Sequence, residues 1–397
     1  MTPKVLTVFG TRPEAIKLAP VIKEFQKTAG ICSRVAVTGQ HRQMLDQVLD
    51  LFKIKPDADL NIMSNNQTLF QITTRSLSGL EKLLVKEKPD LILVQGDTTT
   101  CFAAALSAFY HQIPVGHVEA GLRTDDKYNP FPEEMNRRLT TVLADLHFAP
   151  TALAKKNLIS CGVPEKKIFL TGNTIVDALQ SILEVIDKHA HPVLKKIPSS
   201  AKIILVETHR RENLGKPMEN ICDALDKLVR IFPNVHLIFS VHKNPKVRET
   251  VYRKLDKKER IFLLEPVDYP TLIYLQSKAY LILTDSGGIQ EEAPSLGKPV
   301  LVMRKTTERP EGVKAGAAKL VGTDTKKIFL EAANLLKNKK AYEKMSRVTN
   351  PYGDGKASKR IAEIIKFYFK KNNYSHLFNK NITLVNRRIY LHEDLMA

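Results

Sequence analysis

The sequence predicts an α/β protein built from two doubly wound parallel sheets that face each other across a cleft. In the first half, short apolar or β-branched runs alternate with amphipathic stretches, which is the pattern of repeated strand–helix units. The alternation lapses at residues 189–200, where His, Pro, Lys and Ser are frequent, as in a linker. A second series of strand–helix units begins at residue 203. In such sheets ligands bind outside the carboxyl ends of the strands, so functional residues are expected there.

The first sheet is predicted from five strands and the helices between them. Residues 5–9 form the first strand, and a helix over 13–25 presents Ala15, Leu18, Ile22 and Phe25 on one face. Residues 91–94 are a continuous apolar run, as expected of a strand buried on both faces of a parallel sheet. The remaining predicted strands are 34–38, 115–118 and 146–149, and the remaining predicted helices are 44–51, 68–84 and 98–110.

The second sheet is predicted from strands at 203–206, 235–239, 261–264, 280–283 and 299–302. We therefore place the first domain at residues 1–172, completed by a helix at 356–369, and the second domain at 173–355. Residues 370–397 are rich in Asn and Lys, with β-like patches at 382–385 and 387–391. We interpret them as a basic C-terminal extension.

The composition is that of an ordinary globular protein. The chain has 397 residues, of which 43% are hydrophobic and 26% charged, which argues against disorder, collagen-like repeats and a coiled coil. No apolar run approaches the roughly 18 residues that a membrane helix needs. The N-terminal residues lack the apolar core and cleavage site of a signal peptide. These features predict a cytoplasmic protein with no membrane partner.

The cysteines predict neither a disulfide framework nor a metal site. The four of them, at positions 32, 101, 161 and 222, are scattered, form no C-x-x-C pair and lack the Cys/His spacing of a zinc site. Isolated cysteines in a chain of this size are mostly small buried hydrophobes, so we expect reduced thiols.

The net charge of +19 is the one unusual number in the composition. A nucleic-acid-binding protein would cluster its Lys and Arg residues and interleave them with aromatic side chains. Here the lysines are spread along the predicted helices, and the chain has no tryptophan. We interpret most of the charge as solvated helix faces, with a field that attracts anions to the active site as the second interpretation. Nucleic acid is not an expected partner.

An anion-binding turn is predicted after the first strand. Gly10 permits a sharp turn, Pro13 suits the start of a helix, and free N–H groups then point into the cleft. Arg12 and Lys17 add two cations at the same place. The motif is neither a dinucleotide fingerprint nor a Walker loop, and a solvated helix start would also explain it.

Three carboxylates follow strands of the first sheet. Asp97 comes after the strand at 91–94, Glu119 after the strand at 115–118, and Glu133 opens a helix further on. Helix capping explains acidic residues at such positions. Carboxylates gathered in a dry cleft, however, shift one another's pKa values and so provide a proton donor beside an acceptor. Their convergence on one edge makes the catalytic interpretation as strong as the structural one.

The strand ends of the second half carry groups suited to a nucleotide. His209 follows its first strand with two arginines, which suits an oligophosphate. Ser286, Gly287 and Gly288 open a helix and are better explained as a backbone cradle for phosphate than as a hydrolase elbow. Glu292 on that helix has the chemistry to accept two ribose hydroxyls.

These motifs resemble the non-hydrolysing UDP-N-acetylglucosamine 2-epimerases over nearly the whole chain, to about Phe369. The resemblance rests on residues 10–17, 39–42, 96–100, 116–123, 132–137, 209–213, 284–297, 306–311 and 350–355. It implies the GT-B fold, with two Rossmann-like domains and the substrate between them. It also implies reversible epimerisation of UDP-N-acetylglucosamine to UDP-N-acetylmannosamine, a precursor of cell-surface polysaccharides. UDP leaves carbon 1 as carbon 2 loses its proton, which gives 2-acetamidoglucal, and UDP then adds back.

The resemblance assigns roles residue by residue and implies no cofactor and no metal. The catalytic candidates are Asp97, Glu119, Glu133 and His209. The substrate-binding candidates are Arg12, Lys17, Val267, Leu272, Ser286, Gly287, Gly288, Glu292 and Arg309. A second, regulatory UDP-N-acetylglucosamine site would use Gln40, Gln43, Arg210 and His242. Members of the family also suggest a homodimer.

A few positions depart from the family pattern. Gln95 stands where His usually precedes the Gly-Asp-Thr motif, and Glu207 and Thr208 replace a Thr and a small residue before His209. Asn66 stands where some regulated members have Arg, and Lys305 where Asp is usual.

The alternatives that remain are a hydrolysing epimerase that releases N-acetylmannosamine and UDP, a GT-B glycosyltransferase and, least favoured, a basic nucleic-acid-binding protein.

Overall fold

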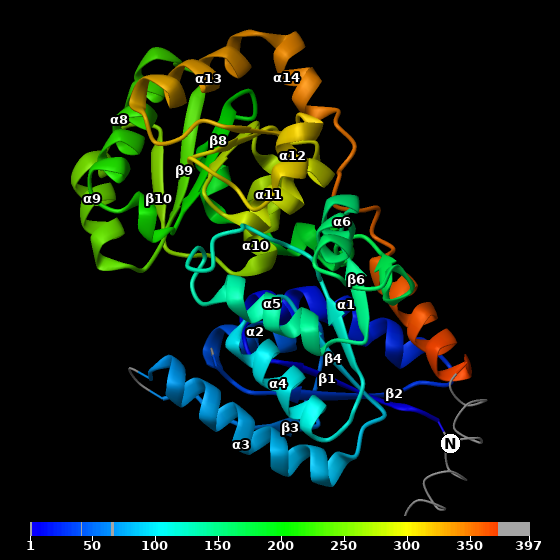
Figure 1. The fold of residues 1–397 in the computed structure, drawn as a ribbon. Coiled ribbons are helices and arrows are strands. Elements are labelled where there is room, and N and C mark those ends of the chain that lie inside the picture. The colour runs from blue at the N-terminus through cyan, green and yellow to red at the C-terminus, as the bar shows by residue number, and fades with distance from the viewer. Residues whose placement is uncertain (1, 41, 65–66, 372–397) are drawn as a thin grey trace, which may run out of the picture.

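Two parallel β-sheets flanked by helices form the framework of the protein, as the alternation of elements predicts (Figure 1). The computed structural model describes residues 2–40, 42–64 and 67–371. The β-like patches predicted at 382–385 and 387–391 lie outside the described residues. Among the helices described, none is long and apolar enough to cross a membrane.

The first sheet contains β1 (Lys4–Phe9), β2 (Cys32–Val37), β3 (Ala58–Asp59), β4 (Leu91–Gln95), β5 (Val115–Val118), β6 (Leu146–Ala149) and β7 (Ile168–Leu170). The second contains β8 (Lys202–Thr208), β9 (Val235–Val241), β10 (Ile261–Leu264), β11 (Leu281–Thr284), β12 (Val300–Val302) and β13 (Ala318–Leu320). The strand orders are β3-β2-β1-β4-β5-β6-β7 and β10-β9-β8-β11-β12-β13. All the pairs are parallel, so the carboxyl ends in each sheet share one edge.

Three of these strands, β3, β7 and β13, are not predicted by the sequence pattern. Each has two or three residues and lies at the edge of its sheet. Edge strands are short and only partly buried, so they lack the continuous apolar run by which the central strands are recognised.

The helices connect the strands in the expected alternation. Their bounds are α1 (Arg12–Lys27), α2 (Arg42–Leu51), α3 (Leu69–Glu87), α4 (Thr99–Tyr110), α5 (Glu133–Leu143), α6 (Ala152–Ser160), α7 (Thr174–Leu183), α8 (Lys216–Ile231), α9 (Pro245–Leu255), α10 (Tyr269–Lys278), α11 (Gly287–Glu292), α12 (Pro310–Ala315), α13 (Thr325–Lys337) and α14 (Lys339–Ser346). Short 3₁₀ turns are η1 (Glu165–Lys167), η2 (Ile186–His189), η3 (Pro192–Lys196), η4 (Arg211–Asn213) and η5 (Ala293–Leu296). The predicted linker at 189–200 therefore contains η3 and the last residue of η2.

Each sheet is buried on both faces. Along β1, Val5 and Phe9 belong to one apolar cluster, whereas Leu6 and Val8 belong to another on the opposite face. Successive side chains of a strand point to opposite faces, and both faces here are covered by helices. The second sheet repeats the arrangement. Ile204 and Val206 of β8 lie on one face, and Ile203 and Leu205 lie on the other.

The last described helix returns to the first half of the molecule. Residues 357–371 are helical and, in orange to red, lie beside the blue elements of the first half in Figure 1. The carboxylate of Asp177 in α7 accepts the backbone N–H groups of Ala357 (3.2 Å) and Ser358 (2.8 Å), which fixes the start of this helix. Ile361 and Ile365 are fully buried in the same apolar cluster as β1.

Candidate active site

The turn between β1 and α1 is tightly built. A Cβ on Gly10 would lie 2.1 Å from Thr38 Oγ1, so glycine is required there. The carboxylate of Glu14 accepts the backbone N–H groups of Gly10 (3.0 Å) and Thr11 (2.8 Å), which satisfies donors that the helix start leaves free. Burial raises the pKa of Glu14 to about 7. This turn brings α1, with its two cations, to the edge of the first sheet.

A buried group of two cations and two carboxylates joins the two halves of the molecule. Lys17 Nζ lies 2.6 Å from Glu119 Oε1 and 3.1 Å from Glu291 Oε2. Arg309 Nη2 lies 3.4 Å from Glu119, and its Nε donates to Glu291. Burial disfavours the charge of Lys17, but the carboxylates of Glu119 and Glu291 outweigh that effect and raise its pKa.

Glu119 is held in an unusual backbone conformation. It follows β5 with a φ of 63°, in the left-handed region that residues other than glycine seldom adopt and that clusters at functional sites. Besides Lys17 and Arg309, its carboxylate accepts the side-chain amide of Gln95, the last residue of β4. The position of the Glu119 carboxylate is therefore determined by residues from both halves of the molecule.

The two other predicted carboxylates meet at the start of α5. Asp97, two residues past β4, lies 2.9 Å from Arg137 Nη2, and its carbonyl oxygen accepts the side chain of Asn136 at 3.0 Å. Glu133 is the first residue of α5, where the helix dipole favours a negative charge. Burial raises the pKa of Glu133, and the charge of Asp97 acts in the same direction. Asp97, Glu119 and Glu133 thus lie at one edge of the first sheet, as the sequence predicts.

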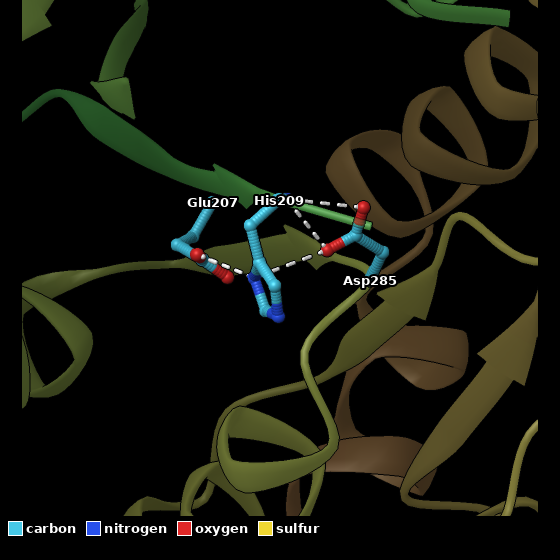
Figure 2. A group of neighbouring side chains, drawn as sticks. All are labelled: Glu207, His209 and Asp285. Carbon is cyan, nitrogen blue, oxygen red and sulfur yellow. Dashed lines mark hydrogen bonds and ion pairs between the residues drawn. The ribbon is translucent and has the colours of Figure 1, made fainter. Parts of the chain in front are cut away.

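His209 lies just past β8 in a group with Glu207 and Asp285 (Figure 2). Its Nδ1 is 2.8 Å from Glu207 Oε1 and 3.5 Å from Asp285 Oδ1. Burial disfavours the charged imidazole, but the hydrogen bond and charge of Glu207, with the charge of Asp285, raise the pKa of His209.

The ligand atoms of Glu207, His209 and Asp285 all lie within 4.8 Å of one another, as they would around a cation. Asp285, however, already accepts N–H groups from His209 (3.0 Å), Arg210 (3.1 Å) and Asn213 (2.7 Å). Nδ1 and Glu207 are likewise at hydrogen-bond distance from each other. Protein donors thus already occupy these acceptors, and we interpret the group as an imidazole held between two carboxylates.

The predicted phosphate cradle opens toward two arginines. Ser286 precedes α11, which begins at Gly287. A Cβ on Gly287 would lie 3.6 Å from Arg309 Nη2 and 3.9 Å from Arg210 Nη2, and one on Gly288 would meet only Ser286 Oγ, at 3.9 Å. Helix-start amides beside guanidinium groups provide both the donors and the charge that a phosphate requires.

The remaining predicted nucleotide residues lie near the junction of the halves. Glu292 is 4% exposed, accepts the Gln276 amide at 2.8 Å, and has its pKa raised to about 7 by burial. Arg12 lines a cavity of about 300 Å³ together with Asp268 and seven other residues from both halves, among them Tyr269. Val267 and Leu272 are partly buried against one of the apolar clusters of the second half.

The residues predicted for a regulatory site are only partly described. Gln40 is half-buried and accepts the hydroxyl of Thr100 at 3.1 Å. The ring of His242 lies 6.1 Å from that of His209, and the Arg210 guanidinium faces Gly287. The side chain of Gln43 and all of Asn66 lie outside the described residues. Arg210 and His242 thus lie beside the predicted active-site groups.

The family model described as UDP-N-acetylglucosamine 2-epimerase matches residues 23–366 of this chain. The chain belongs to this family. It is 55% identical over 366 residues to the UDP-N-acetylglucosamine 2-epimerase of Bacillus subtilis, covering 92% of this chain and 96% of that protein.

Solved structures of epimerase-family members share the fold. The UDP-GlcNAc 2-epimerase of Neisseria meningitidis bound to UDP-GlcNAc is 53% identical, with a TM-score of 0.87 over 91% of this chain and 99% of that one. The enzyme of Methanocaldococcus jannaschii in complex with UDP-GlcNAc and UDP is 38% identical, with a TM-score of 0.79 over 92% and 99%. The GT-B fold expected from the motifs is thus confirmed.

Four neighbours of the predicted groups in this epimerase-family chain are not identified as site residues by sequence reasoning. They are Glu291, Arg137, Gln95 and Asp285. Glu291 is adjacent to Glu292, and Arg137 ends one of the family motifs, but neither position indicates its partner. The ion pairs of Glu291 with Lys17 and Arg309, and that of Arg137 with Asp97, are seen only in the folded structure, where the strand ends lie together.

Proposed function

We propose that this protein catalyses the reversible, non-hydrolysing epimerisation of UDP-N-acetylglucosamine to UDP-N-acetylmannosamine. The observation that carries the proposal is the placement of Asp97, Glu119 and Glu133 at one sheet edge, with Arg309 of the other half paired to Glu119. The names of the relatives and the ligands in their structures support the substrate.

The proposed chemistry follows from the substrate. The hydrogen on carbon 2 of the sugar has no adjacent carbonyl, so direct deprotonation and reprotonation is not feasible. Instead, the bond from carbon 1 to the UDP oxygen breaks with both electrons leaving on UDP, while carbon 2 loses its proton. The product is 2-acetamidoglucal, and re-addition of UDP with a proton delivered to the opposite face of carbon 2 completes the inversion.

This sequence of steps makes two demands on the site. Acid/base groups must reach both faces of the ring, and Asp97, Glu119 and Glu133 are the candidates. Preorganised cations and N–H donors must hold UDP while it is detached and carries extra charge. For that role we propose Arg12, Lys17, His209 and the amides of residues 286–288. Glu292 would hold the ribose, Arg309 the nucleotide, and Leu272 with the backbone of Val267 the uracil.

The domain division at 1–172 with 356–369 and 173–355 is part of the proposal, as are a homodimer and a regulatory UDP-N-acetylglucosamine site that uses Gln40, Gln43, Arg210 and His242. A cytoplasmic location remains a prediction from the apolar patterning and the N-terminal residues, and a role in supplying polysaccharide precursors remains a prediction from the family resemblance.

The deciding experiment is proton NMR of the purified protein with UDP-N-acetylglucosamine in heavy water. UDP-N-acetylmannosamine that carries deuterium at carbon 2 and retains UDP would support the proposal. Free N-acetylmannosamine with UDP would indicate the hydrolysing branch instead. No exchange at carbon 2 would overturn an epimerase and leave the GT-B glycosyltransferase.

A further inference from the structure

Glu207 is placed to act on His209. Glu207 is the second-last residue of β8 and His209 directly follows the strand. Side chains two positions apart along extended chain share a face, and the Glu207 carboxylate indeed reaches the His209 ring. The Glu207 carboxylate is held at both oxygens, Oε1 by the Nδ1–H of His209 at 2.8 Å and Oε2 by the hydroxyl of Thr284 at 3.3 Å. Thr284 is the last residue of the neighbouring strand β11.

Asp285, the second carboxylate beside His209, contacts the backbone of the loop. Its carboxylate is fully buried and accepts the backbone N–H groups of His209 and Arg210 together with the side chain of Asn213. Asp285 therefore holds the loop that carries His209, whereas Glu207 holds the ring itself. A change at Glu207 acts on the imidazole without removing the support of the loop.

The second ring nitrogen of His209 is left for another partner. In Figure 2, Nε2 points away from both carboxylates. We propose that Glu207 is a positioning residue for His209: it accepts the Nδ1 proton, and so directs Nε2–H of the charged ring toward an anionic group of the substrate. The inference rests on the proposed function, since it takes that anion to be the diphosphate of UDP.

The charges around the ring define the expected pH dependence. Glu207 on β8 and Asp285 after β11 face it with negative charge, and Arg210 and His242 face it as cations or potential cations. The two carboxylates outweigh burial and the charge of Arg210, and they raise the pKa of His209. If protonated His209 assists the departure of UDP, activity falls as pH rises through that pKa. Without the charge of Glu207, the same fall must occur at lower pH.

The first test is an NMR titration of the histidine ring signals without substrate, with His209 assigned by His209→Gln. Glu207→Gln keeps the size of the side chain and an acceptor for Nδ1–H, but removes the charge. The pKa of His209 is expected to fall in Glu207→Gln and to stay unchanged in Glu259→Gln, a surface control in the same half with a side chain 90% exposed. An unchanged pKa in Glu207→Gln would overturn the inference.

The second test uses kinetics with UDP-N-acetylglucosamine. Mutating the hydrogen-bond partner of a metal-bound imidazole costs about tenfold to a hundredfold in activity. For Glu207→Gln, which loses the charge but keeps an acceptor, we expect a loss of about tenfold, mainly in kcat. Glu207→Thr, which removes the acceptor as well as the charge, should lose more. In a His209→Gln background neither Glu207→Gln nor Glu207→Thr should reduce activity further, because the imidazole that Glu207 orients is absent. If activity falls in that background by the same factor as in the wild type, the role of Glu207 is merely structural. An inactive wild type would refute the proposed function, while the titration would still decide the role of Glu207.

Discussion

Lys17 on α1 and Glu291 on α11 form a buried ion pair of 3.1 Å that links helices from opposite halves of the molecule. Lys17 is also paired with Glu119, and Arg309 is paired with both carboxylates. Two of the cations proposed to hold the nucleotide, Lys17 and Arg309, are thus already paired with carboxylates. If UDP binds there as proposed, it competes with Glu119 and Glu291 for these cations, and the exchange would free Glu119.

Removing the charge of Lys17 should destabilise the fold. Lys17→Met leaves the two buried carboxylates with Arg309 alone, and breaking a buried pair costs about 3–5 kcal/mol. Urea unfolding measures the loss, with Lys27→Met, on the exposed last turn of the same helix, as the control. Equal stabilities of the two variants would contradict the importance of the network. The affinity for UDP should fall in Lys17→Met but not in Lys27→Met.

Asp97→Asn should abolish turnover and leave UDP binding largely intact. The substitution keeps the shape of the side chain beside Arg137 but removes its acid/base capacity, and such groups contribute about 10²–10⁴-fold to rate. Turnover is followed by NMR and UDP affinity by calorimetry. Asp125→Asn is the control, because that side chain is 92% exposed. A parallel loss of binding and activity would count against the acid/base role.

Gly287→Ala should weaken UDP binding by at least about tenfold without loss of stability. The added methyl would lie 3.6 Å from Arg309, an ordinary contact, so the fold tolerates it. A phosphate that approaches the helix-start amide would instead meet the methyl. Thermal unfolding and calorimetric titration with UDP separate the two effects. Undiminished affinity would place the diphosphate elsewhere.

Glu292 should make stability depend on pH. Its pKa of about 7 in the folded protein, against 4.5 as the ordinary value, means that the folded state binds more protons between these pH values. Stability therefore falls as pH rises from 4.5 through 7, by about 3 kcal/mol for a shift of this size. Glu292→Gln should lack this fall. Between pH 5 and pH 8, the free energy of unfolding of the variant should therefore decrease less than that of the wild type. Glu259→Gln, on the surface, should follow the wild type.

The central strands and the site motifs could be predicted from the sequence, because each has a local signature. The run at 91–94 is buried on both faces, and its end carries Asp97. The partners of the site residues could not be predicted. Gln95 and Glu119 are 24 residues apart, Lys17 and Glu119 are 102 apart, and no spacing rule connects them. Glu207 is an unexplained departure until β8 and β11 are seen side by side.

The helix at 357–371 has a consequence for the order in which the protein is made. Ile361 and Ile365 complete an apolar cluster that begins at Val5, so the earliest and latest parts of the described chain share one core. During synthesis the first sheet is complete at Leu170, but about 190 further residues must be made before Ile361 is added to this cluster. Part of the apolar surface thus stays uncovered for about half of translation, and a chaperone that binds such surfaces would find it there.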